Sequence, residues 1–229
     1  VSGGSFLALR APGYTSSMLN RPGSRPGALI GSYNRSSLQK YAPDYISQAE
    51  YEAKIQANKA LAALIQVSKL ETIQVLSNPK RDFMKRDEAS FSRELSQAQL
   101  AAAQLEPALQ QAYEILRLGE SDRSKLTNLR WQAGYDLAMG RLLAARSRIE
   151  GYNAMLALMK RGKKFENEMS TAWVLVPSTD TEVGSVIKKI GDRAVQYLER
   201  VKAEHPGTPW ARMAEMELQV PVGWLWQEQ

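Results

Sequence analysis

Two long stretches of this 229-residue chain space their apolar residues alternately four and three positions apart, which restricts the fold to a helical body more than any other feature does. The first stretch contains Phe91, Leu95, Ala98, Ala102, Leu105, Leu109, Ala112 and Leu116. The second contains Trp131, Tyr135, Ala138, Leu142, Ala145, Ile149, Tyr152, Leu156 and Met159. Heptad spacing aligns apolar side chains along one helix face, so both stretches predict long helices, the second from about Asp122 to Arg161.

Pro107 lies inside the first stretch and removes one backbone hydrogen bond from a continuous helix. We therefore expect a kink near Ala103 or two helices that meet at Glu106. Leu118-Gly119-Glu120-Ser121-Asp122 then has the pattern of a glycine helix end followed by a new N-cap. Two long helices with so short a connection predict an antiparallel helical hairpin.

The segment before this hairpin predicts a supporting helix. Ser47-Gln48-Ala49-Glu50 has the form of a capping box, in which the serine oxygen and the glutamate side chain each satisfy a backbone amide. The helix should run from about Gln48 toward Leu76, before Asn78-Pro79. Its middle, Ala60 to Ile65, is apolar on nearly all sides and predicts contacts on more than one side.

The last part of the chain changes in composition and predicts a small α/β unit. Thr171 to Val176 has the β-branched and aromatic content of a strand, and Pro177 should stop it. A capping box at Thr179–Glu182 should open a helix to about Ala203, and Thr208-Pro209 a short helix to Leu218. The closing Pro221–Trp226 alternates like a strand that pairs with Trp173–Val176.

The N-terminal part is a basic arm. Residues 1–43 hold five of the thirty basic residues and none of the twenty-four acidic ones, while the remainder is nearly neutral. Ser5–Leu9 is the only strand-like run in the arm, and repeated Pro-Gly steps predict an extended connection over Ala11–Pro43. The fold class expected is mainly α: an extended arm over 1–43, a long helical hairpin or bundle over 44–164, and a C-terminal α/β cap over 165–229.

Composition excludes much of enzyme chemistry. The chain has no cysteine and a single histidine, His205, so thiol nucleophiles, disulfides and most zinc sites are excluded. His205 precedes Pro206 in a turn, and a histidine that packs or caps there is the favoured interpretation over a catalytic base beside Glu204 and Thr208. We predict no catalytic residues, no metal and no cofactor. No window approaches the length of apolar chain that a membrane span requires.

Some charged residues allow two interpretations. Asp136 lies in an apolar stretch, and we expect it to be half-buried and paired with Arg130 or Arg141 rather than to bind a metal. The glutamates of the last helices are expected on a solvated face, with partners among nearby basic residues: Glu199, Glu204, Glu215 and Glu217.

The possible interaction residues lie in the arm and at the C-terminus. The basic residues of the arm are Arg10, Arg21, Arg25, Arg35 and Lys40. Their single spacing is typical of an extended tail and lacks the dense clusters that neutralise many phosphates, so nucleic acid is the less favoured partner. Trp224 and Trp226 could form an aromatic binding surface, although tryptophans in so small a unit more often build the core.

Two resemblances extend this interpretation. Val195 to Ala211, with its His205-Pro206-Gly207-Thr208-Pro209 turn, resembles one hairpin of extracytoplasmic tetratricopeptide-like repeats. A wider resemblance is to the C-terminal region of planctomycete proteins with a von Willebrand factor A-type domain. The segments that look like this region are Tyr41–Tyr45, Arg130–Leu143, Thr171–Pro177, His205–Ala211 and Val222–Trp226. Ser2–Leu7 is similar to a late strand of that domain, whose metal site would lie upstream.

The function expected is therefore structural. The long seams and the missing catalytic set favour a non-enzymatic interaction domain that mediates assembly or scaffolding in a bacterial envelope or secreted protein. Its expected partner is another protein or a second copy, not a small-molecule substrate, and an extracytoplasmic location follows from the resemblances. The alternative is a module that binds an anionic polymer, an acidic glycan or nucleic acid, through the basic arm.

Overall fold

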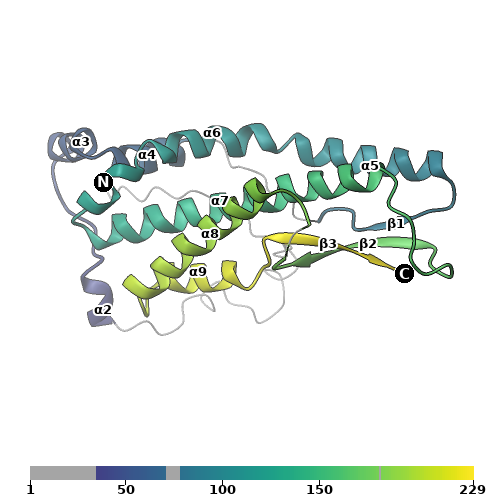
Figure 1. The fold of residues 1–229 in the computed structure, drawn as a ribbon. Coiled ribbons are helices and arrows are strands. Elements are labelled where there is room, and N and C mark those ends of the chain that lie inside the picture. The colour runs from purple at the N-terminus through teal and green to yellow at the C-terminus, as the bar shows by residue number, and fades with distance from the viewer. Residues whose placement is uncertain (1–34, 71–77, 181) are drawn as a thin grey trace, which may run out of the picture.

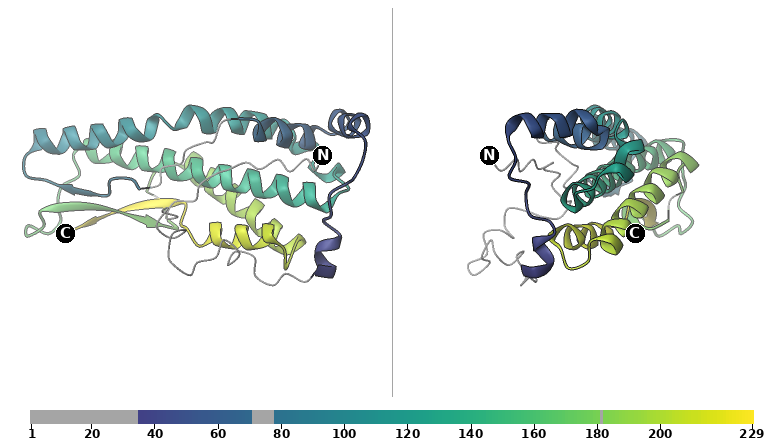
Figure 2. Two further views of the ribbon diagram at one scale, coloured as in Figure 1. Left: turned by 180° about the vertical axis from the view of Figure 1, so that it is seen from behind. Right: turned by 90° about the vertical axis from the view of Figure 1, so that its left-hand side faces the viewer.

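The computed structural model describes residues 35–70, 78–180 and 182–229. These residues form a mainly helical, elongated body with a small three-stranded antiparallel sheet near one end (Figure 1). Figure 2 shows that the longest helix lies along the long axis and that the sheet lies against one side of it. The predicted fold class, mainly α with a small C-terminal α/β part, is confirmed.

The predicted hairpin is present. Its first arm consists of α5 (Glu88–Ala103) and α6 (Glu106–Arg117), and its second arm is α7 (Leu129–Lys160). The break between α5 and α6 confirms the expected meeting point at Glu106, because Pro107 sits in the first turn of α6, where a missing N–H costs no helical bond. Most seam residues of both arms are buried.

The turn between the two arms differs from the prediction. Residues Glu120–Lys125 form the 3₁₀ helix η2, and α7 begins only at Leu129, where the Asn128 side chain accepts from the Arg130 amide at 2.9 Å. Gly119 does not adopt the left-handed conformation of a glycine cap, since its φ is −86°. A Cβ at Gly119 would lie 2.5 Å from Cα of Ala60, so this glycine permits a close backbone approach.

The supporting helix is divided in two. The Ser47–Glu50 capping box opens α3 (Gln48–Ala57) as predicted, but α3 ends at Asn58, and α4 (Lys59–Ser68) follows directly. Asn58 has an extended backbone, and its side chain accepts from the Leu61 amide at 3.0 Å, as an N-cap does. The predicted continuation toward Leu76 falls partly on residues 71–77, outside the described residues.

The sheet joins segments from two parts of the chain in the order β1-β2-β3. The predicted pairing is confirmed, because β2 (Ala172–Ser178) runs antiparallel to β3 (Gly223–Glu228). The sequence did not predict β1 (Asp82–Met84), which pairs with the start of β2. Pro177 does not end β2. Its ring nitrogen faces the same edge as the Leu175 amide, which donates to Arg81, and β1 no longer runs beside Pro177.

In the sequence, the last two helices lie between β2 and β3. The predicted capping box at Thr179–Glu182 is wrong, since α8 (Ser185–Glu204) begins after Gly184, whose φ of +49° turns the chain into the helix. The short helix α9 (Pro209–Leu218) is confirmed, with Thr208 as its side-chain cap. In the arm, α2 (Arg35–Gln39) replaces part of the predicted extended connection, and the predicted strand Ser5–Leu9 lies outside the described residues.

The core surrounds α7, which packs against α5 and α6, against α8, and against the sheet. Alternation places the large side chains of the sheet on the face toward α7, where all are buried: Phe83, Trp173, Leu175, Trp224 and Trp226. A Cβ at Gly140 of α7 would lie 2.8 Å from Leu198 of α8, so the two helices approach closely at this glycine. Among the described residues, no helix is long and apolar enough to cross a membrane.

Candidate functional site

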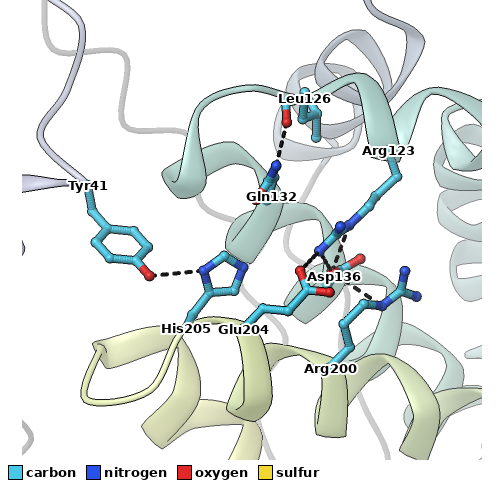
Figure 3. A network of polar contacts seen from close by, with 8 residues as sticks. All are labelled: Tyr41, Arg123, Leu126, Gln132, Asp136, Arg200, Glu204 and His205. Atoms are coloured by element: carbon cyan, nitrogen blue, oxygen red, sulfur yellow. Dashed lines mark hydrogen bonds and ion pairs between the residues drawn. The ribbon is translucent and has the colours of Figure 1, made fainter.

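A group of charged side chains surrounds the buried Asp136 where α7, α8 and η2 meet (Figure 3). Asp136 of α7 is completely buried, and Arg123 of η2 donates to its Oδ2 from Nε at 2.9 Å and from Nη2 at 2.5 Å. Nη2 of Arg123 also lies 2.5 Å from Glu204 of α8, and Nε of Arg200 lies 3.5 Å from Asp136. We call these four residues the Asp136 network.

The Asp136 network corrects two predictions. Asp136 is completely rather than half buried, and its partners are Arg123 and Arg200 instead of Arg130 or Arg141. The reason is geometric: at about 100° per residue, neither Arg130 nor Arg141 lies on the Asp136 face of α7, so the cations come from neighbouring elements.

Burial decides the electrostatics of this carboxylate. Removal from water raises the pKa of Asp136 above its usual range, while the hydrogen bonds from Arg123 oppose that change. Oδ1 of Asp136 has no hydrogen-bond partner in the part of the chain that the structure describes. The carboxylate is therefore tightly held through one oxygen, and its other oxygen faces the protein interior.

His205 lies at the end of α8 beside this network and is also completely buried. Its Nδ1 lies 3.0 Å from the Tyr41 hydroxyl, and its Nε2 has no partner within the described ranges. Burial lowers the pKa of His205; the charge of Glu204 opposes this shift and that of Arg123 adds to it. His205 is therefore packed in the interior at the turn after α8, as the favoured interpretation predicted.

Tyr41 is the partner that sequence reasoning missed. Its ring stacks on Trp210 of α9 at a centroid distance of 5.4 Å and meets the His205 ring edge-on at 5.7 Å. The contact joins residues 164 positions apart, so no local pattern could have predicted it. The only signal was the presence of both residues in segments quoted for the resemblance to the von Willebrand factor A-type proteins.

A second buried network fixes the end of α9 to α7. Nη1 of Arg148 lies 2.5 Å from Glu217, and Nε of Arg141 lies 3.2 Å from the same carboxylate. Arg148 also donates to the carbonyl oxygens of Val220 and Pro221 at 2.8 and 3.0 Å. The prediction that Glu217 lines a solvated face is therefore wrong. Glu199 and Glu215, in contrast, pair with Lys202 and Arg212 on exposed faces as expected.

The predicted interaction residues are not brought together in the described structure. Arg10, Arg21 and Arg25 lie outside the described residues, Arg35 begins α2, and Lys40 is exposed just after α2. At the C-terminus, the interaction role is corrected: Trp224 and Trp226 are each 6% exposed. Their indole N–H groups donate to the carbonyl oxygens of Arg148 and Met155, so both belong to the core.

These polar groups hold elements of the fold together. In residues 35–70, 78–180 and 182–229, no three His, Cys, Asp or Glu side chains are grouped so that they could hold a metal ion. The buried charges instead tie η2, α7, α8 and α9 together, and Tyr41 ties the N-terminal segment to the same place. Comparisons with protein-family models, with curated proteins and with solved structures found no significant match.

Proposed function

We propose that this chain is a non-catalytic interaction domain that mediates assembly or scaffolding in a bacterial envelope or secreted protein. The observation that carries the proposal is the use of its buried polar groups. Each of the two ion-pair networks and the Tyr41–His205 contact joins elements far apart in sequence. Such contacts make a body stiff, which a scaffold needs and which an enzyme site alone does not explain.

The shape of the body supports the same function. α7 has 32 residues and so spans about 48 Å at 1.5 Å per residue. Figure 1 places α2 near one end of this long axis and the end of β3 near the other, and Figure 2 agrees from behind. Segments joined to α2 and to β3 would therefore be held apart by a rigid spacer.

Exposed apolar side chains near both ends offer places for protein partners. Tyr45, between α2 and α3, is 88% exposed, and Met169, in the loop between α7 and β2, is 85% exposed. Single exposed apolar residues are common on protein surfaces, so they support contact points rather than a large interface. The envelope location rests on the resemblance to extracytoplasmic tetratricopeptide-like and von Willebrand factor A-type proteins.

The test is partner capture combined with native mass measurement on the full chain. Self-association should give a dimer or larger species, and a protein partner from a planctomycete envelope extract should be retained by the wild-type chain. Tyr45→Ser and Met169→Ser should weaken retention, whereas Gln111→Ser, at an exposed position of α6, should not. A strictly monomeric chain that retains no partner would contradict the proposal.

A further inference from the structure

The segment that precedes α3 is seated on the body through a tyrosine. From residue 36 to residue 59, Tyr41 is the one buried residue, at 8% exposure. Two local backbone bonds, from Tyr41 to Leu38 and from Ala42 to Gln39, link it to α2. We call residues 35–43 the strap. Tyr41 lies between His205 and Trp210 and so anchors the strap to the body; Figure 3 shows its contact with His205.

The strap has a natural hinge on its C-terminal side. Asp44 is fixed to the body by Lys54 at 2.8 Å and by Asn128 at 3.2 Å. Ala42 and Pro43 lie between Tyr41 and Asp44. Ala42 is exposed and Pro43 is partly exposed. Tyr41 can therefore leave its seat by rotation at 42–43 without disturbing α3, α4 or α7.

The seat contains the chain's single histidine, which is completely buried while Tyr41 is docked. Tyr41 can donate to Nδ1 of the neutral ring or accept from a protonated Nδ1, so the contact itself survives protonation. Protonation instead places a cation in a completely buried ring whose Nε2–H has no partner among the described residues. When Tyr41 leaves, the His205 ring gains water, which solvates the charged form.

We propose that the strap is a pH-sensitive latch: Tyr41 is docked against neutral His205, and protonation of His205 releases it. The charged groups around the ring come from every element packed there, namely Arg123 from η2, Asp136 from α7, and Arg200 and Glu204 from α8. Glu204 favours protonation, but Arg123 already pairs with both carboxylates, and burial lowers the pKa of His205.

The sign of the pH effect follows from this burial. A histidine whose pKa is lower in the docked state favours docking at pH values above its ordinary pKa of about 6.5, and docking weakens as the pH falls below that value. Uptake of one proton changes the ratio of released to docked strap by at most about tenfold per pH unit.

Spin-label distance measurements on the full chain test the latch. The chain has no cysteine, so Lys40→Cys and Arg212→Cys, both at exposed positions near the Tyr41–Trp210 contact, introduce the only labels. Between about pH 7.5 and about pH 5.5, the short-distance population should fall. The His205→Asn variant, which keeps a polar group but does not titrate, should show no such fall.

Two controls make each outcome decisive. A label pair within the body, Gln111→Cys with Arg212→Cys, should keep its distance over the same pH range. Broadening of that pair would mean unfolding and would overturn the proposal, as would an unchanged strap distance or an equal fall in His205→Asn. Independently, the NMR signal of the single histidine ring should titrate with a midpoint below about pH 6.5 in the wild type. In Tyr41→Ala the midpoint should rise to about pH 6.5.

Discussion

Trp224 gives the sharpest test of how the sheet is held on α7. Its side chain is 6% exposed, meets Tyr152 edge-on at 5.6 Å, and donates to the Arg148 carbonyl at 2.8 Å. Truncation to alanine leaves a large cavity, which costs about 3 to 5 kcal/mol for a buried tryptophan. The Arg148 carbonyl lies within α7 and keeps its helical bond, so little is added for an unsatisfied acceptor.

Urea unfolding followed by far-ultraviolet circular dichroism measures this loss without relying on tryptophan fluorescence. The midpoint should fall at unchanged slope, and the melting temperature should drop by about 6 to 20 °C, at about 2 to 4 °C per kcal/mol for a chain of this size. Leu225→Ala is the matched control, since Leu225 is the next residue of β3 on the opposite, half-buried face, and should cost about 1 kcal/mol. A Trp224→Ala variant as stable as Leu225→Ala would refute the core assignment.

Three further changes test other parts of the body by thermal melting or circular dichroism. Leu142→Asp places a carboxylate at a position with no exposure and should cost more than about 4 kcal/mol; a variant that melts like wild type would disprove the seam. Asp136→Ala leaves Arg123 partly buried without its main partner and should cost about 3 to 5 kcal/mol, more than Glu199→Ala at an exposed ion pair. Deletion of Val1 to Lys40 should preserve the helical signal, because the seated Tyr41 remains; loss of helicity would contradict this.

The sequence predicted best what depends on neighbouring residues. The two heptad seams predicted the hairpin because helical periodicity is written into residues three and four positions apart. Pro107 and the Thr208-Pro209 pair marked helix starts for equally local reasons. The pairing of β2 with β3 was accessible because their strands alternate and contain large aromatic residues.

What escaped prediction depends on contacts between distant segments. The helix break at Asn58 coincides with bonds to Asp122, whose side chain accepts from the Lys59 amide at 3.0 Å and whose carbonyl accepts from Asn58 at 3.1 Å. The strand β1 has only three residues and exists because β2 lies beside it. A run of three residues carries no signal for a partner strand about 90 positions away.

The polar contacts also explain why the body should respond as one unit. Arg123 and Glu204 are 81 positions apart, and Arg148 and Glu217 are 69 positions apart. Neither pair can form until α8 lies on η2 and α9 lies on α7, and withdrawal of Glu217 leaves Arg148 as a buried, unpaired charge. Separation of α8 and α9 from α7 therefore exposes the apolar contacts at Gly140, removes Arg200 from Asp136 and leaves Arg148 without Glu217 in the same step. Because these free-energy costs arise in the same step, partial detachment of α8 and α9 is unfavourable. The strap is held at an edge by Tyr41 and can move without these costs.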